Sequence, residues 1–103
     1  MADDLSELTA ALRDFADRRD WHQFHTPKNL AMALAGEVGE LVAELQWLTP
    51  EECTSLSDGA RDRLALEAAD VFIYLVRLAD ITGIDLLDAA TRKMATNEVR
   101  FPH

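Results

Sequence analysis

Two separate stretches of the chain carry pairs of acidic residues at helical spacing. Glu37 and Glu40 lie three residues apart, and Glu67 and Asp70 repeat this spacing further along the chain. Because residues three and four apart share one face of a helix, each pair presents two carboxylates together. If the two helices pack side by side, four carboxylates meet, and like charges that close repel unless a cation lies among them or some are protonated. We therefore predict a site for a hard divalent cation at these four residues.

The ligand types narrow the choice of metal. All four candidate ligands are carboxylates, and neither pair has the Glu-x-x-His pattern that di-iron helical bundles use. Ligation by oxygen alone favours Mg²⁺, with Mn²⁺ as the alternative. A protein-bound Mg²⁺ is usually held by a few carboxylates together with substrate phosphates, so the pattern indicates a phosphate-bearing substrate. The ion would offset phosphate charge and lower the pKa of an attacking water.

Aromatic residues accompany both acidic pairs. Trp21 precedes the first pair and Trp47 follows it, and two tryptophans near a metal site could stack on a nucleobase. The alternative is that both are anchors at the boundary of the core. Tyr74 follows Asp70 by four residues and so shares its helix face, where its hydroxyl could reach a sugar or a phosphate.

Polar residues elsewhere add further candidates for binding. His25 could donate a hydrogen bond to a substrate, whereas zinc binding with His22 is disfavoured because no cysteine or further histidine supports it. Near the end of the chain, two cations and an amide share one helix face and could grip phosphates: Lys93, Asn97 and Arg100. The competing interpretation is a solvated final turn favoured by the helix dipole.

Four stretches with helical periodicity must position these residues. Thr26 with Pro27, and Asp85, are good helix starts, and Gly83 is a good helix end. The predicted helices run over about residues 3–19, 27–48, 60–82 and 85–100, and Thr49 opens one further turn. Four helices with short connections predict an all-α four-helix bundle, formed as a single domain over residues 1–103.

The third predicted helix is apolar nearly all round in its centre, Val71 to Val76. Such a helix is buried on several sides, which a chain of 103 residues has difficulty providing alone. We therefore expect at least a homodimer.

Composition excludes several classes of partner. The chain has 19 acidic against 10 basic residues and a formal net charge of -9, so we expect no binding to nucleic acid polymers or to anionic membranes. The single cysteine, Cys53, excludes an intrachain disulfide framework and fits a reducing cytoplasm. Met1 is followed shortly by two aspartates and no apolar run, so we also expect no signal peptide.

Three runs of sequence together resemble the MazG-like, all-α nucleoside triphosphate pyrophosphohydrolases, and within them the dCTP pyrophosphatase branch. The resemblance covers about Phe15 to Pro102, and its runs are RDWHQFHTPKNLAMALAGEVGELVAELQW, LEAADVFIYLVRLAD and KMATNEVRFP. It implies that Glu37, Glu40, Glu67 and Asp70 are the Mg²⁺ ligands.

The resemblance also implies roles for the other candidates. Trp21 and Trp47 match positions that line the base pocket, and His25 and Tyr74 fall at neighbouring positions. The motif on the phosphate side matches Lys93, Asn97 and Arg100, with Phe101 where tyrosine is frequent. Family members form dimers or dimers of dimers, with the pocket near the subunit interface.

The implied reaction is hydrolysis of a (deoxy)nucleoside triphosphate to the monophosphate and pyrophosphate. The expected substrate is dCTP or a modified dCTP, in sanitation or control of the nucleotide pool. Two alternatives stay open: a non-enzymatic acidic helical interaction module, and a MazG-like hydrolase of another nucleotide-like substrate.

Overall fold

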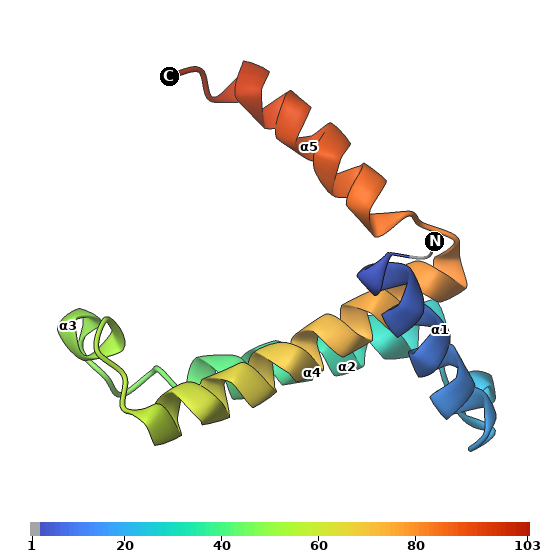
Figure 1. Ribbon diagram of the computed structural model, residues 1–103, viewed down its shortest axis with the longest axis horizontal. Helices are drawn as coiled ribbons and strands as arrows, with labels where there is room; N and C mark the ends of the chain where they lie inside the picture. The colour runs from blue at the N-terminus through green and yellow to red at the C-terminus, as the bar shows by residue number, and fades with distance from the viewer. Residues whose placement is uncertain (1–2) are drawn as a thin grey trace.

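A computed structural model describes residues 3–103, and these residues form helices joined by short turns, with no β-strand among them (Figure 1). The elements are α1 (Asp4–Asp17), the 3-10 turn η1 (Trp21–Gln23), α2 (Pro27–Ala43), α3 (Pro50–Cys53), α4 (Asp58–Thr82) and α5 (Leu86–Arg100). The predicted all-α class and the four long helices are confirmed. Met1, on which the expectation of no signal peptide depended, lies outside the described residues.

Side chains cap the helices at the predicted positions. Thr26 accepts a hydrogen bond from the backbone N–H of Asn29 at 3.2 Å, and Asp85 caps α5 in the same way. Thr49 forms a complete capping box with Glu52, which opens the short α3. These contacts satisfy backbone donors that the first helical turn leaves free.

Helix α2 ends at Ala43, so the prediction that it runs to Leu48 was wrong. Beyond Val42 backbone N–H groups bond to the carbonyl three residues back, as Leu45 does to Val42 at 3.0 Å, with one last four-residue bond from Gln46 to Val42 at 2.9 Å. The following Thr49 precedes proline and must be extended, with ψ 161, so the helix has to unwind before it. Trp47 therefore lies in a turn and not on a helix face.

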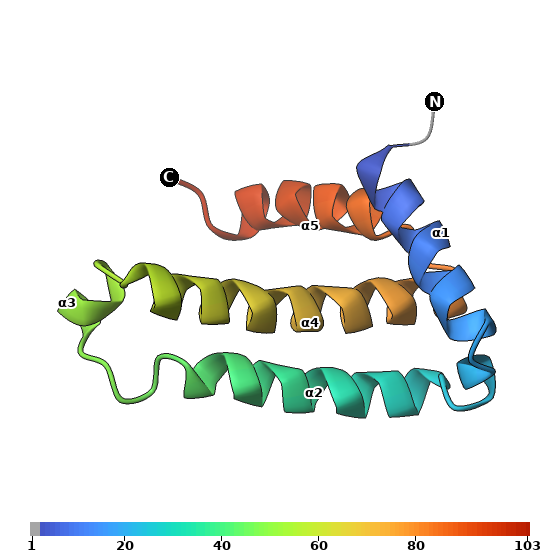
Figure 2. The ribbon, with the colours of Figure 1, turned by 60° about the horizontal axis from the view of Figure 1, so that its bottom comes forward.

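Helices α2 and α4 run side by side, and α1 crosses one end of this pair (Figures 1 and 2). The small core lies near that crossing, where Leu30 of α2, Val76 of α4 and Ala16 of α1 are almost fully buried. Arg13 of α1 fastens the crossing by donating from Nε and Nη2 to both carboxylate oxygens of Asp80 on α4, at 3.0 and 2.7 Å.

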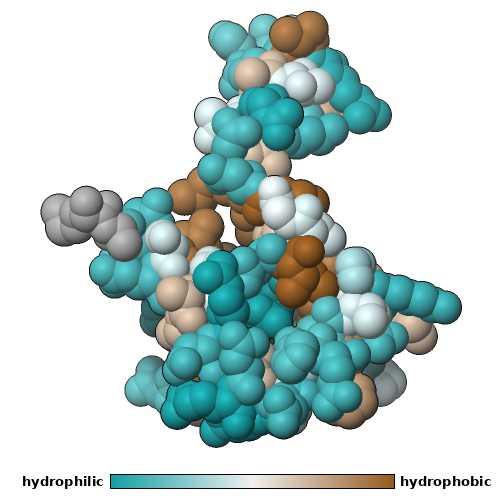
Figure 3. Space-filling model, turned by 90° about the vertical axis from the view of Figure 1, so that its right-hand side faces the viewer, coloured by the Kyte–Doolittle hydropathy of each residue, from teal (hydrophilic) through white to brown (hydrophobic). Residues whose placement is uncertain are grey.

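Helix α5 stands away from the other helices (Figures 1 and 2). The accessible surface of the chain is 7865 Å², against about 5,800 Å² expected for a compact monomer of this mass. Hydrophobic residues are visible on this surface below the lobe that α5 forms at the top of Figure 3. Large apolar residues of α5 are more than half exposed: Leu87, Met94 and Val99. One chain alone thus leaves much apolar surface uncovered.

None of the helices within residues 3–103 combines the length and the apolar character that crossing a membrane requires.

The end of α4 supplies a test of the backbone geometry. Gly83 ends α4 and has φ 71, in the left-handed region. Gly59 lies in the first turn of α4, where an added Cβ would make only an ordinary van der Waals contact. We expect Gly83→Ala to lower the free energy of unfolding by about 1 kcal/mol because a side chain disfavours that conformation. Gly59→Ala should cause no loss. Urea unfolding at one protein concentration measures both, and equal effects of the two substitutions would contradict this account.

Candidate functional site

Three carboxylates converge where α2 and α4 run side by side. Glu37 of α2 and Glu67 and Asp70 of α4 each contribute an oxygen, and these oxygens all lie within 4.8 Å of one another. Glu37 and Glu67 are half-buried, and Asp70 is exposed. The predicted convergence of the two acidic pairs is therefore confirmed for these three residues, which we call the acidic cluster.

Two further acids, Glu40 of α2 and Glu44 just after it, lie outside the acidic cluster. Glu40 is not among the three carboxylates within 4.8 Å, yet its charge helps to raise the pKa of Glu67. Glu44 follows the end of α2 and accepts from Nε of Arg63 at 3.2 Å, so a guanidinium already balances its charge. The charges of Glu40 and Glu44 both raise the pKa of Glu67, and the two residues differ in that Glu44 also forms an ion pair that joins it to α4.

The electrostatics of the acidic cluster suit a hard cation. Burial raises the pKa of Glu67, and the charges of Asp70, Glu40 and Glu37 raise it further. Within residues 3–103, no lysine or arginine forms an ion pair with the three cluster carboxylates. A set of oxygen donors under mutual repulsion, with no cationic side chain among them, fits a divalent cation that prefers oxygen ligands.

The face of α4 that carries Asp70 leads away from the cluster towards the start of α2. Tyr74 and Arg77 follow Asp70 at four and seven residues, so the three lie along one stripe. The rise of a helix puts Arg77 about 10 Å from Asp70 along the axis. At that end, Nε of Arg77 donates to Nδ1 of His25 at 3.4 Å, and Nη2 of Arg77 lies 3.3 Å from the same nitrogen.

The surroundings of His25 favour the neutral form of its ring. Burial lowers its pKa, and the nearby charge of Arg77 lowers it further. Because a guanidinium can only donate, Nδ1 of His25 must accept, and the ring proton therefore resides on Nε2. The expectation that His25 can act as a donor is thus chemically consistent, and its contact with a substrate stays a prediction.

Trp21, the first residue of η1, lies beside His25. Its ring packs edge-to-face against Phe15 at a centroid distance of 5.6 Å and lies 6.1 Å from the His25 ring. The guanidinium of Arg19 covers the Phe15 ring at 3.5 Å. With 43% of its surface exposed, Trp21 is anchored through one edge and still offers area for stacking.

Trp47 lies beyond the opposite end of α2 and is 87% exposed. The 17 residues of α2 span about 26 Å. Trp21 and Trp47 of one chain therefore cannot stack on the same base.

The predicted phosphate-binding residues are also separate from the acidic cluster. Lys93 and Arg100 are exposed and Asn97 is half-buried on α5, which stands away from α2 and α4 (Figure 1). Within one chain they do not complete the site.

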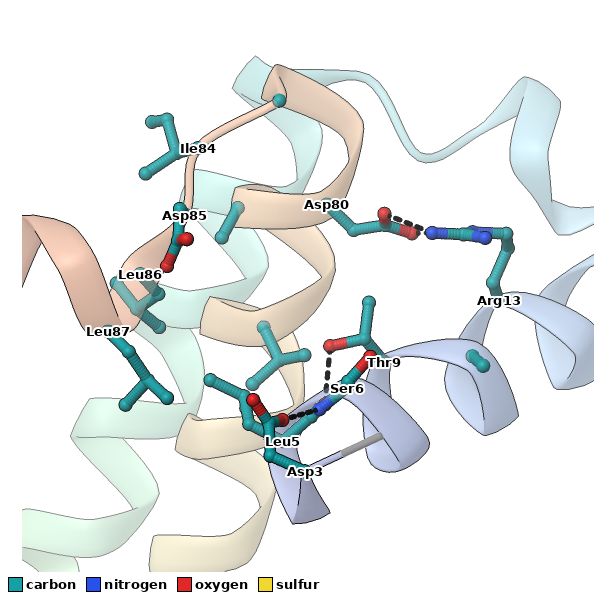
Figure 4. Close-up of a pocket in the computed structure, with 14 residues that line it drawn as sticks. Asp3, Leu5, Ser6, Thr9, Arg13, Asp80, Ile84, Asp85, Leu86 and Leu87 are labelled. Atoms are coloured by element: carbon teal, nitrogen blue, oxygen red, sulfur yellow. Dashed lines mark hydrogen bonds and ion pairs between the residues drawn. The ribbon is translucent and has the colours of Figure 1, made fainter. Parts of the chain in front are cut away.

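A hollow of about 400 Å³ opens elsewhere, between α1, the end of α4 and the start of α5 (Figure 4). Arg13 and Asp80 line it, and the acidic cluster does not. It contains none of the predicted substrate-binding residues.

Sequence reasoning missed the polar network of Arg13, Arg77 and Asp80. A signal was present, because Arg77 directly follows the apolar run that ends at Val76, and Asp80 follows it at the spacing of an ion pair. The contact with Arg13 joins residues 67 positions apart and has no local signature.

Comparison with known proteins places this geometry in a family. The family model described as "MazG nucleotide pyrophosphohydrolase domain" matches residues 25–103. A crystal structure of a pyrophosphatase from Archaeoglobus fulgidus superposes with a TM-score of 0.93 at 38% identity, covering 100% of this chain and 96% of that one.

Curated relatives give a more specific similarity. Over 100 residues the chain is 46% identical to dCTP pyrophosphatase 1 of Bos taurus and 46% identical to that of Homo sapiens. The match covers 95% of this chain but spans only 59% of the length of each of these relatives.

The repulsion in the acidic cluster predicts a response to metal. A carboxyl group whose pKa is raised by folding lowers stability as pH rises above its unfolded value, so Glu67 destabilises the metal-free protein at neutral pH. We expect Mg²⁺ to raise the Tm at pH 7.5 and to lose most of this effect near pH 4.5, where protons compete. Glu67→Gln should raise the Tm in EDTA and abolish most of the Mg²⁺ response.

Differential scanning fluorimetry measures these shifts, and Asp62→Asn is the control because it removes an exposed charge from the same helix outside the cluster. A Mg²⁺ response that survives Glu67→Gln but not Asp62→Asn would place the ion elsewhere.

Proposed function

Because the chain belongs to the MazG nucleotide pyrophosphohydrolase family, we propose that it hydrolyses a nucleoside triphosphate between the α and β phosphates. The products are the monophosphate and pyrophosphate. The observation that carries this proposal is the acidic cluster of Glu37, Glu67 and Asp70, with which no lysine or arginine of the described residues 3–103 forms an ion pair. The substrate we propose is dCTP or a modified dCTP, since the curated relatives are dCTP pyrophosphatases. The role is sanitation or control of the nucleotide pool.

Mg²⁺ is the proposed cofactor, with Mn²⁺ as the alternative, and Glu37, Glu40, Glu67 and Asp70 would hold it. When bound, the ion would neutralise phosphate charge and lower the pKa of the attacking water. The acidic residues would hold the ion in place and one carboxylate would help to orient the water, so catalysis would be mainly positioning and electrostatic stabilisation.

The stripe along α4 gives the nucleotide a direction. With its phosphates at the acidic cluster, a nucleotide laid along this face would pass Tyr74 and reach His25 and Trp21 with its base. The separation of about 10 Å along the helix axis between Asp70 and Arg77 is comparable with the distance from the phosphates to the base of an extended nucleotide. Trp21 would stack on the base and His25 would donate a hydrogen bond to it.

A second copy of the chain is the partner that would complete the site. The surface in excess of a compact monomer, about 2,000 Å², suits a substantial interface between copies of the chain. Lys93, Asn97 and Arg100 of α5, and Trp47, would then come to the acidic cluster and the base from a neighbouring subunit. A homodimer or a dimer of dimers meets this requirement. The absence of nucleic acid partners and the cytoplasmic location stay predictions of the sequence.

A screen for pyrophosphate release tests the activity. With Mg²⁺ we expect release from dCTP or a modified dCTP above the other nucleotides, and none in EDTA. Glu40→Ala and Asp70→Ala should each lower kcat/KM by more than about 100-fold because each removes a ligand of the ion. Glu44→Ala is the matched control: it lies in the same acidic pattern but pairs with Arg63, so its loss should stay below about tenfold.

Pyrophosphate release at the wild-type rate from Asp70→Ala would refute the assignment. If no nucleotide is hydrolysed and Mg²⁺ leaves the Tm unchanged, the acidic interaction module is the correct alternative. If the protein hydrolyses only a different nucleotide-like compound, the alternative of a MazG-like hydrolase with another substrate is correct.

Mixing two inactive variants tests whether the site is shared between subunits. Glu40→Ala damages the metal side and Asn97→Ala the phosphate side. If α5 acts on a neighbouring subunit, refolding the two together restores one intact site in some oligomers, to about a quarter of wild-type activity in a randomly mixed dimer. Light scattering gives the mass, which should be a multiple of 11.5 kDa. Activity that never recovers in a proven mixed oligomer would mean that each site lies within one chain.

A further inference from the structure

Arg77 is a buried charge at the end of the α4 stripe. It is 5% exposed, and within residues 3–103 no other charged residue is buried. Its guanidinium has two partners: Nη1 donates to Asp80 at 3.1 Å, and the Nε side faces Nδ1 of His25 at 3.4 Å. A buried charge with so few partners is costly unless each contact serves the structure or the site.

Asp80 does not depend on Arg77 for its pairing. Both of its oxygens accept from Arg13, which holds the pKa of Asp80 below its usual range. Asp17 also acts on Arg13, so the positive charge that remains beside His25 is that of Arg77. Asp80 therefore anchors Arg77, and Arg77 directs its remaining donors at the imidazole.

The backbone and the ring of His25 are both held. Its backbone N–H bonds to the carbonyls of Trp21 and His22 at 3.1 and 3.2 Å, within the turn η1. The charged group that contacts the ring is Arg77 of α4, with Asp80 behind Arg77 and Arg13 of α1 behind Asp80. No carboxylate other than Asp80 is among these groups, so nothing favours a second proton on the ring.

We propose that Arg77 is a positioning residue that fixes His25 with its proton on Nε2, so that the nucleoside end of the site presents a hydrogen-bond donor and never an acceptor. This inference builds on the proposed function for the identity of that end. A donor held in this way favours a base whose edge offers an acceptor, such as a ring carbonyl. A base that presents an amino group at the same place would find no acceptor for it.

Nitrogen-15 NMR of the full-length protein reads the tautomer directly. We expect wild-type His25 to be the neutral Nε2–H form at pH 7 and to titrate below pH 6.5. Arg77→Met should mix the tautomers and raise the pKa of His25, because it removes both the donor and the nearby charge. This variant leaves Asp80 bonded to Arg13, so no buried carboxylate loses its last partner.

Arg13→Met is the matched control. It removes a guanidinium from the same network but leaves Arg77 paired with Asp80 and facing His25, so the tautomer of His25 should not change. An Nδ1–H or protonated His25 in the wild type, or an unchanged His25 in Arg77→Met, would overturn the proposal.

Kinetics on dCTP separate positioning from folding. Arg77→Met and His25→Ala should each raise KM about five- to tenfold, as expected for one hydrogen bond, with a smaller change in kcat. The double variant should be no worse than His25→Ala, because Arg77 acts through His25. Additive losses would overturn the positioning role. The NMR measurement does not require turnover. A wild type that hydrolyses no nucleotide would therefore refute the proposed function, and the tautomer of His25 measured by NMR would still test the role of Arg77.

Discussion

Repulsion among the carboxylates of α2 and α4 is the constraint on which the rest of the structure depends. The same side-by-side packing that buries Leu30 and Val76 brings Glu37, Glu67 and Asp70 within 4.8 Å of one another. Folding therefore forces together charges that would separate in an unfolded chain, and the raised pKa of Glu67 records this cost. The divalent cation that we propose for this cluster would relieve the repulsion, and the family to which the chain belongs is named for nucleotide hydrolysis.

Helix α4 joins the two ends of the candidate site. Its acids lie beside α2, and one helical stripe then passes Tyr74 and reaches the Arg77 network. The two ends have opposite electrostatic character: the cluster is negative and partly open, whereas Arg77 places a buried positive charge beside an imidazole whose neutral form is favoured. With the proposed cation at the cluster, the phosphates of a nucleotide would suit the acidic end, and its uncharged, hydrogen-bonding base would suit the other.

The chain by itself is open. Helix α5 carries Lys93, Asn97 and Arg100 away from the acids, and the accessible surface of 7865 Å² is far above that of a compact monomer. A site divided between helices that do not touch within one chain couples the proposed activity to assembly, so that subunit association would control both stability and turnover.

The sequence by itself determined what depends on local spacing. Helical periodicity and caps such as Thr26 and Gly83 located the helices, because these signals act within a few residues. The three-residue spacing of the acids likewise predicted that α2 and α4 would each present a carboxylate pair. Tertiary structure decided which charges meet. It assigned Glu44 to Arg63 and joined Arg13 to Asp80 across 67 positions, and it placed Trp47 at the far end of α2 from Trp21. Such contacts depend on how helices cross and where they end, and these properties arise from packing that spacing along the chain does not encode.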